Sequence, residues 1–499
     1  SRRGGPSGPP ENLRSDITGR AQIDLALPSG DAPVRGTYAV KAERVKFAGY
    51  DARNVDAAGR IDGRVVRVKA RANAYGGRAD ATGSVSVGQP VALDLAGRAA
   101  NVDLRNLPPV LKMPGVPSDL QFTYTLTGRD GVYSGDVTLD ASTLAGASIT
   151  QGTTGQFTLG GGAPGYAAQG QVSDLDVQQI GRGFAVPAIA TDRFRSRINA
   201  TFDVKGSGGG RYPLTLDATG TAVDSEMFGA SFPRLDFTTN FSGGDARVKA
   251  LGQFSGLDPA VITGNTKLAG NLSGAADVDT TIRDYGAGVT VDSLDASGRV
   301  NLGTSMFGGF AIDSAVIDGT YANREGQLTQ LAIAGPDLNV SANGAVALND
   351  TGASNLTAHL DSASLERLGE IIGRPLKGAA VVDTTITGNA RELKAEGTLQ
   401  GSNIGYGETD ALSMNSTFSI AVPELTPEDA TVQAKSTATF VEIAGQSIRE
   451  LTAETTYAQS KLEFNAVAQE GIRLLAADGS AVFVDTVRNL QFGSAGVGW

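Results

Sequence analysis

The chain has 499 residues, no cysteine, one histidine and a formal net charge of −11. Without cysteine it can form neither a disulfide nor a thiolate metal site. Its acidic balance argues against nucleic-acid binding, which needs a basic face. Glycine accounts for 66 residues, about 13% against a usual share of about 7%. Such a composition favours many short strands joined by tight turns over helices.

Charge is distributed unevenly along the chain. Residues 1–100 contain 16 Lys and Arg against 10 Asp and Glu, a net charge of +6, so the remainder carries −17. In the basic part, Arg67 and Lys69 alternate with Val66 and Val68. This alternation predicts a strand whose cations face solvent. Contact of these cations with anionic lipid head groups is the alternative interpretation.

The start of the sequence and its lack of long apolar runs give information about the cellular compartment of the protein. The sequence starts at Ser1 and contains no run of about 18 apolar residues. Because it shows neither a signal peptide nor a membrane span, we expect a piece of a longer protein. The absence of cysteine fits an oxidising compartment such as a bacterial periplasm, although chance also explains it. Residues 1–12 predict a flexible lead-in, and 481–499 a C-terminal extension of uncertain structure.

Apolar and polar residues alternate along most of the chain. Phe202 and Val204 fall on the apolar side of one such segment. Leu235, Phe237 and Phe241 fall on the apolar side of another. A period of two indicates β-strands with one apolar and one polar face. Gly, Asn and Asp separate these segments at intervals of roughly 8–12 residues, as turns do.

Aspartate recurs in a fixed setting, between two apolar residues that are five positions apart. The four copies are centred on Asp103, Asp176, Asp258 and Asp361. An aspartate in this position can accept hydrogen bonds from the first free N–H groups of a helical turn. We therefore expect a short, capped helix after each copy, and the longest in residues 362–373.

Glycine also recurs, with apolar residues near six and twelve positions downstream. The copies start at Gly49, Gly229, Gly309, Gly405 and Gly445. We interpret each glycine as a bulge or turn between two paired strands. The two patterns together predict about five degenerate repeat units, 13–100, 101–172, 173–256, 257–357 and 358–480, which form one continuous groove.

No group of residues in the sequence indicates catalysis, a cofactor or a metal ion. His359 has no second histidine or cysteine with which to form a metal site or a triad, which predicts a structural role. The glycine-rich run 206–210 is not followed by Lys-Ser/Thr, as a phosphate-binding loop would be. Acidic residues such as Asp236 and Asp245 lie at alternate strand positions or in turns. Solvated faces explain them better than general acid–base chemistry does.

A resemblance to a known family rests on four passages: GRAANVDLRNLPPVL, QVSDLDVQQIGRGF, SRINATFDVKGSG and LDSASLERLGEIIGRPLKGAAVVDTTITG. With the two recurring patterns, they make most of residues 13–480 similar to the AsmA-like superfamily and its TamB-type proteins. The resemblance implies an all-β fold, a long, curled, repetitive β-sheet forming a taco-like hydrophobic groove with a few short helices between units. It also implies a periplasmic protein, anchored to the inner membrane and reaching the outer one, with roles in phospholipid transport and outer-membrane protein assembly.

Three functions remain open. The first is a lipid conduit whose partners are phospholipids and, through segments missing here, the inner and outer membranes. The second is a scaffold whose sheet edges template strands of outer-membrane proteins by β-augmentation, with an outer-membrane barrel-assembly protein as partner. The third is a repetitive surface adhesin or stalk. A membrane-spanning barrel is disfavoured because the aromatic girdles it needs are absent from the sequence.

The candidate lipid-binding residues are apolar side chains of the same parity in strands of different units. We expect them to point into one continuous concave surface, whereas a sandwich would bury them against a second sheet. The candidates are Phe202, Val204, Leu235, Phe237, Phe241, Phe418, Ile420, Leu462 and Phe464.

Stacked repeat units predict a particle much longer than it is wide, with strands in more than half of the residues and helices in less than roughly 15%. Small-angle scattering of the purified chain should therefore give an elongated particle. A compact globule in that experiment would contradict the groove.

Overall fold

The structure is a computed structural model that describes residues 15–26, 33–47, 50–87, 91–108, 115–184, 187–209, 212–284, 290–443, 445–484 and 486–498. Strands take up 74% of the residues and helices 7%, which confirms an all-β fold with a few short helices. The chain divides into two compact units, Ser1–Ala246 and Arg247–Trp499. The expected lead-in, 1–12, lies outside the described residues.

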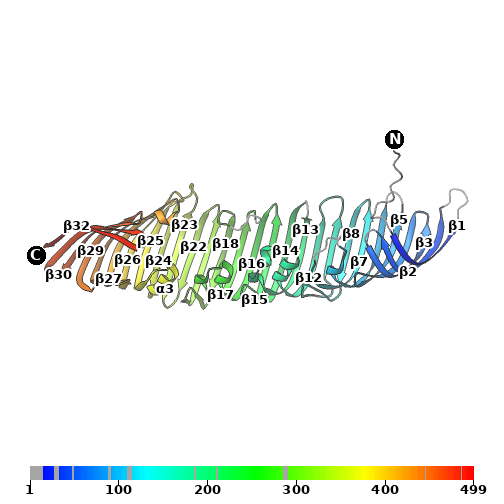
Figure 1. The fold of residues 1–499 in the computed structure, drawn as a ribbon, viewed down its shortest axis with the longest axis horizontal. Helices are drawn as coiled ribbons and strands as arrows, with labels where there is room; N and C mark the ends of the chain where they lie inside the picture. The colour runs from blue at the N-terminus through cyan, green and yellow to red at the C-terminus, as the bar shows by residue number, and fades with distance from the viewer. Residues whose placement is uncertain are drawn as a thin grey trace, which may run out of the picture. The chain divides into compact units, whose positions relative to one another are not determined.

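The first unit is an antiparallel series in which strands pair with their neighbours along the chain (Figure 1). A short hairpin, β9 and β10, is inserted between β8 and β11, and pairs with β7 and β12 on its two sides. Its strands are β1 (Ser15–Ala26), β2 (Arg35–Phe47), β3 (Tyr50–Asp62), β4 (Val65–Ala74), β5 (Gly77–Ser86), β6 (Ala92–Val102), β7 (Ser118–Arg129), β8 (Val132–Leu139), β9 (Ser142–Leu144), β10 (Ala147–Ile149), β11 (Thr154–Leu159), β12 (Gly165–Leu175), β13 (Ser196–Gly209), β14 (Tyr212–Met227) and β15 (Ala230–Ser242).

The second unit is built in the same way, with a short hairpin of β19 and β20 between β18 and β21. Residues 486–498 of the expected C-terminal extension form a strand, β32, that pairs with β31. The strands are β16 (Asp245–Leu257), whose first two residues precede the boundary, β17 (Gly270–Ile282), β18 (Leu294–Leu302), β19 (Ser305–Phe307), β20 (Phe310–Ile312), β21 (Ser314–Ala322), β22 (Glu325–Ala334), β23 (Leu338–Ala347), β24 (Ser354–Ser362), β25 (Leu376–Asn389), β26 (Glu392–Tyr406), β27 (Thr409–Pro423), β28 (Thr431–Ile443), β29 (Gln446–Ala458), β30 (Lys461–Glu470), β31 (Arg473–Val484) and β32 (Thr486–Gly498).

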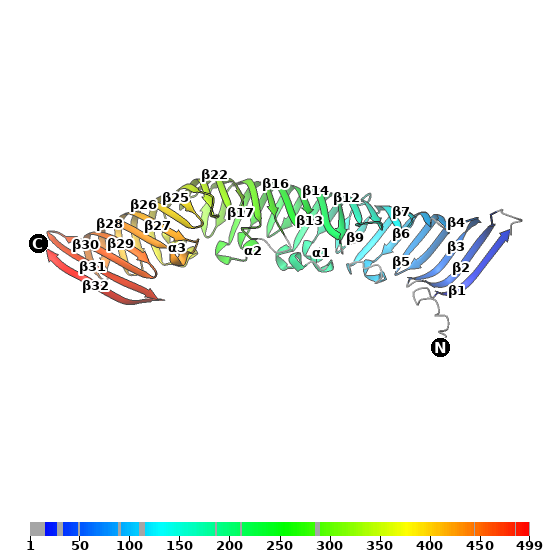
Figure 2. The ribbon, with the colours of Figure 1, turned by 90° about the horizontal axis from the view of Figure 1, so that it is seen from above.

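Short helices join the ends of some strands. In the second unit, α2 and α3 lie along one margin of the sheet (Figure 2). The helices of the first unit are η2 (Leu104–Asn106), α1 (Val177–Gly183), η4 (Pro187–Ile189) and η5 (Asp192–Phe194). Those of the second are α2 (Pro259–Thr263), η6 (Thr266–Leu268), α3 (Leu365–Ile372) and η8 (Pro427–Asp429).

Three of the four recurring aspartates cap a helix as the sequence predicts. Asp103, Asp176 and Asp258 accept a hydrogen bond from the backbone N–H two residues later, at 3.1, 3.0 and 3.0 Å respectively. The prediction for Asp361 was wrong. That residue still belongs to β24, where it pairs with Asn339, so the strand continues past the expected cap and α3 starts only at Leu365.

The recurring glycines lie mostly in tight turns. Gly229, Gly309 and Gly445 fall in turns that join β14 to β15, β19 to β20 and β28 to β29. At the first of these turns, residue 228 has φ +57° and Gly229 has φ +76°, a pair typical of the type I′ hairpin turn. Gly405 does not lie in a turn, because β26 runs on to Tyr406. It lies instead beside a register shift between β25 and β26, which fits the predicted bulge. Gly49 lies outside the described residues.

Buried serines anchor three hairpins that have two-residue turns, a feature that the sequence analysis missed. Each serine lies four residues before the second residue of a two-residue turn, so a Ser-x-x-x-Gly spacing was the available signal. Its Oγ accepts a hydrogen bond from a backbone N–H of the neighbouring strand in the ladder, which ties the strand end in place. The pairs are Ser142 with Gln121 N at 3.0 Å, Ser225 with Asn199 N at 2.9 Å, and Ser305 with Ser273 N at 3.0 Å.

The alternation of β4 has the predicted register. Arg67, Lys69 and Arg71 are exposed, whereas Val66 and Val68 are partly buried on the other side. A slip of one residue would have reversed the two sets. The sheet therefore separates its faces as the period of two indicates.

Replacing Ser225 with Ala should destabilise the β14–β15 hairpin. The serine is 1% exposed, so the Asn199 N–H loses its acceptor where water cannot replace it. We expect the free energy of unfolding to fall by about 1–3 kcal/mol, and the Asn199 amide to exchange hydrogen faster. The exposed Ser231, across the same turn, supplies the control variant Ser231→Ala. Unchanged exchange at Asn199 in Ser225→Ala would contradict the anchoring role.

Candidate functional site

The five candidate residues of the first unit share one face of β13, β14 and β15. Phe202 and Phe237 both stand directly opposite Gly220, one from each neighbouring strand. Residues opposite one another in an antiparallel ladder project to the same side, as do residues two positions apart in a strand. The remaining three on that side are Val204, Leu235 and Phe241. We call this side of the strands in each unit the apolar face.

The apolar face continues across the whole described series of the first unit. One row of directly opposite residues can be followed from β1 to β15. It consists of apolar residues, glycines and two tyrosines. The row is Ile23, Tyr38, Gly59, Val68, Gly83, Leu95, Leu126, Gly135, Phe157, Tyr166, Gly206, Leu216 and Phe241.

The four candidate residues of the second unit also share a face. Phe418 and Phe464 lie in one row across β27 to β30, separated by one residue each of β28 and β29. Ile420 and Leu462 lie in the adjacent row of the same strands. The register therefore brings these four together on the apolar face of their own unit.

The same face reaches back to β17, where the sequence analysis named no candidate. The row of Ile420 is Val278, Gly298, Gly319, Leu328, Gly344, Leu356, Ile386, Ala395, Ile420, Val432, Tyr457 and Leu462. A cavity of about 370 Å³ lies over its first part, lined by Val278, Val300, Leu328 and Leu356 among others. The alternation was visible in the sequence, but the absence of phenylalanine made these strands less conspicuous.

Large side chains on the apolar face lie over glycines of the next strand. A Cβ on Gly220 would come within 2.6 Å of Phe237 Cζ, and one on Gly397 within 2.8 Å of Phe418 Cζ. The ring thus occupies the space that a side chain of the neighbouring strand would fill. Aromatic rings placed over glycine in this way hold the register of a sheet.

The apolar face has no second sheet packed against it in the described parts of either unit. The described strands make their main contacts with strands beside them in the ladder, with an inserted hairpin or with a short helix, as β25 does with α3. All nine candidate side chains are accordingly partly exposed, where a sandwich core would bury them. Along strands such as β4 and β30, the apolar positions are nevertheless less exposed than the polar ones. The apolar face is therefore sheltered but accessible.

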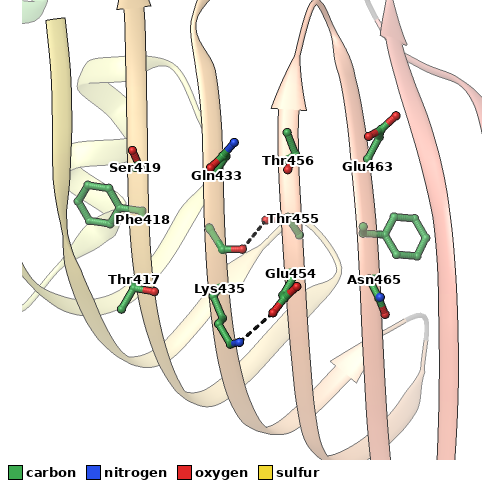
Figure 3. A pocket seen from close by; sticks show the side chains of 12 residues that line it. Thr417, Phe418, Ser419, Gln433, Lys435, Glu454, Thr455, Thr456, Glu463 and Asn465 are labelled. Carbon is green, nitrogen blue, oxygen red and sulfur yellow. Dashed lines mark hydrogen bonds and ion pairs between the residues drawn. The ribbon is translucent and has the colours of Figure 1, made fainter.

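The opposite, polar face carries paired charges. In the second unit, Lys435 and Glu454 stand directly opposite each other on β28 and β29, with Nζ and Oε1 2.8 Å apart (Figure 3). They line a shallow hollow of about 620 Å³ together with polar residues such as Thr417, Gln433 and Asn465, and the strands there also bring Phe418 and Phe464 to its lining. Both charged side chains are more than half exposed, so the pair contributes little to stability. We therefore interpret this hollow as part of the solvent-exposed polar surface and not as a binding site.

The one histidine lies on the polar face as part of a cross-strand pair. His359 Nδ1 is 2.6 Å from Oδ1 of Asp383, the residue directly opposite in β25. Among the described residues, no group of three or more His, Asp and Glu side chains could hold a metal ion. In the same part of the chain, no helix has the length and apolarity to cross a bilayer.

Comparisons with known protein families, with curated proteins and with solved structures find no match for this chain.

The Lys435–Glu454 pair predicts a perturbed carboxyl titration. The ammonium of Lys435 hydrogen-bonds Glu454 and holds its pKa below the ordinary 4.5. In Lys435→Met the pKa should rise towards that value, measured by NMR titration of the Glu454 carboxyl carbon. Because the folded-state pKa is lowered, any stability from the pair is present above pH 4.5 and is lost as pH falls through the folded-state pKa. Lys461→Met, which removes a different pair, should leave the Glu454 titration unchanged.

Proposed function

We propose that the chain is a lipid-carrying scaffold of the AsmA-like, TamB type that works in the periplasm. Acyl chains lie along the apolar face, head groups stay at its polar margins, and phospholipids pass between the inner and outer membranes without nucleotide chemistry. In this proposal the chain also supports outer-membrane biogenesis.

One observation carries the proposal: in the described part of each unit, an apolar face continues from strand to strand and has no second sheet packed against it. Water in contact with such a surface is unfavourable, and a bound acyl chain would gain about 0.8 kcal/mol for each CH₂ group it buries. Rings such as those of Phe237 and Phe418 lie over the glycines, so the apolar surface continues across them. An extended chain could therefore lie across several strands without displacing a side chain.

A second candidate, strand templating, is favoured by the first strand. Among the described strands β1 pairs with β2 alone, so its outer edge presents free backbone groups over 12 residues. Ile17 and Ile23 on this strand are 60% and 57% exposed. A long, exposed edge with apolar side chains is able to accept an incoming strand by β-augmentation. The two functions are compatible because one uses a face and the other an edge.

Phe237→Asp separates a lipid-carrying face from a buried core. On an accessible face the carboxylate keeps contact with water, so the free energy of unfolding should fall by less than about 2 kcal/mol, against several kcal/mol in a closed core. Lipid capture by a photo-crosslinking residue at position 237 should be strong in cells. The same crosslinker at Thr238, which is exposed on the polar face of the same strand, should capture little.

The matched charge variant is Thr238→Asp, which adds the same carboxylate on the opposite face. It should fold and preserve lipid capture by a crosslinker at Phe202, whereas Phe237→Asp should abolish that capture. Equal crosslinking of lipid at 237 and 238, or unfolding of Phe237→Asp alone, would refute the lipid-carrying face. The strand-templating scaffold would then be the better explanation.

A further inference from the structure

The polar face of β1 to β5 carries cations that stand directly opposite one another. The register places Arg20 opposite Lys41, and Arg60 opposite Arg67. A third pair joins Arg44 to Arg53. Like charges in directly opposite positions destabilise a sheet. Complementary charges also stand directly opposite one another, both in these strands, as at Lys41 and Asp56, and in the second unit, as at Lys435 and Glu454.

Acidic side chains nearby neutralise only part of this charge. Asp51 accepts a hydrogen bond from Arg44 Nε at 3.0 Å, and Asp56 one from Arg71 at 2.8 Å. Arg35 and Asp62 form a further pair at 3.1 Å. Between residues 15 and 86 the sequence still contains 12 Lys and Arg against 8 Asp and Glu. An excess of positive charge therefore remains on an exposed surface.

The cations gather around a hollow of about 920 Å³ on this face. Arg20, Lys41, Arg71 and Arg78 line it from four different strands. The amides of Asn54 and Asn73 add hydrogen-bonding groups, and the carboxylates of Glu43 and Asp56 also reach the lining. All four cations are exposed, so an anion from outside can reach their charged groups, although Arg71 is also paired with Asp56.

The distances between the like-charged pairs indicate how large an anionic partner must be to contact all of them. Arg53 and Arg60 lie seven residues apart on β3, a distance of about 23 Å, and the pairs span β1 to β4, about 14 Å. One small anion cannot reach all of these pairs. Tyr75 is an aromatic side chain beside Arg53 and Arg78 on this face, and its OH accepts a hydrogen bond from Asp51 N at 2.7 Å. One ring supplies no series of stacking platforms, which disfavours single-stranded nucleic acid. A broad anionic surface fits the two-dimensional arrangement.

We propose that the polar face of β1 to β5 docks against an anionic lipid surface, with lipid phosphates between the opposed cations. The remainder of the chain, with its net charge of −17, is repelled by the same surface, so contact is restricted to these strands. The docking face goes beyond the proposed lipid-carrying role, because it lies on the other side of the sheet. Each cation near such a surface adds to the attraction, and salt weakens it.

Co-sedimentation of the whole chain with vesicles tests the docking face. Vesicles of equal parts phosphatidylcholine and phosphatidylglycerol should bind it at low salt, and vesicles of phosphatidylcholine alone should not. A triple variant, Arg60→Gln with Arg67→Gln and Lys69→Gln, should weaken binding on the order of a hundredfold. Its urea midpoint should be unchanged or raised, because the Arg60–Arg67 repulsion is removed. This second measurement separates lost docking from lost folding.

The matched control removes three cations from the second unit: Arg299→Gln, Lys435→Gln and Lys461→Gln. The net charge changes by the same amount, yet vesicle binding should be preserved. Equal loss in both triple variants, or equal binding to neutral vesicles, would overturn the proposal. Displacement by inorganic phosphate at matched ionic strength would instead assign the hollow to a free anion, and binding of heparin but not vesicles would assign it to a soluble polymer. Lipid crosslinking at position 237 tests the apolar face, on the other side of the sheet. Its result is therefore independent of the result for vesicle binding.

Discussion

The register of the antiparallel ladder is the constraint on which the rest of this structure depends. A sheet without a facing layer cannot rely on a thick core to hold its strands in place. If one strand slipped by a single residue, its apolar side chains would move to the polar face and its charged ones to the apolar face. Phe237, for example, would lose its place over Gly220, and Asp236 would take it. The separation of apolar and polar side chains onto two faces therefore depends on the features that fix the register of the strands.

Three kinds of local feature supply that alignment. The tight turns set the pairing at one end of a hairpin, as at Gly229. The buried serine hydroxyls tie a strand end to a backbone N–H of its neighbour, as Ser225 does for Asn199. Aromatic rings over glycines then hold the middle of the pair. Because each feature acts between adjacent strands, the stability of a strand depends mainly on its two neighbours, as in other repeat proteins.

Burial in this molecule is correspondingly thin. Of the 22 apolar residues that are buried among those described, 16 are alanines, so the interior consists largely of small side chains near the sheet itself. One buried cluster, formed by Ala147, Val172, Ala200 and Ala222, is of this kind. Phe254, Phe310 and Ile312 are large buried residues, whereas the nine candidate side chains stay partly exposed. This distribution differs from a sandwich core, in which large side chains are the most buried, and it leaves the apolar face available to a ligand.

The sequence predicted strands and faces far better than it predicted neighbours. A period of two assigns Arg67 and Phe202 to opposite kinds of surface without any knowledge of pairing, and both assignments agree with the structure. Helix starts were harder, because a capping aspartate works only if the strand ends before it. At Asp361 the ladder with Asn339 continues instead. The cross-strand partners, such as Arg60 with Arg67 or Phe202 with Gly220, depend on turn length and bulges, which the alternation does not encode.

A single-layer sheet also explains how one set of strands can serve two partners. Adjacent residues of a strand project to opposite faces, so Val66 and Val68 of β4 belong to the apolar face while Arg67 and Lys69 belong to the basic one. A lipid tail on one side and an anionic head-group surface on the other would thus meet side chains that do not touch each other. Selection can change either set without disturbing its neighbour, provided that the backbone hydrogen bonds and the register are preserved. In a sandwich this freedom is lost, because one face of every strand is already committed to the core.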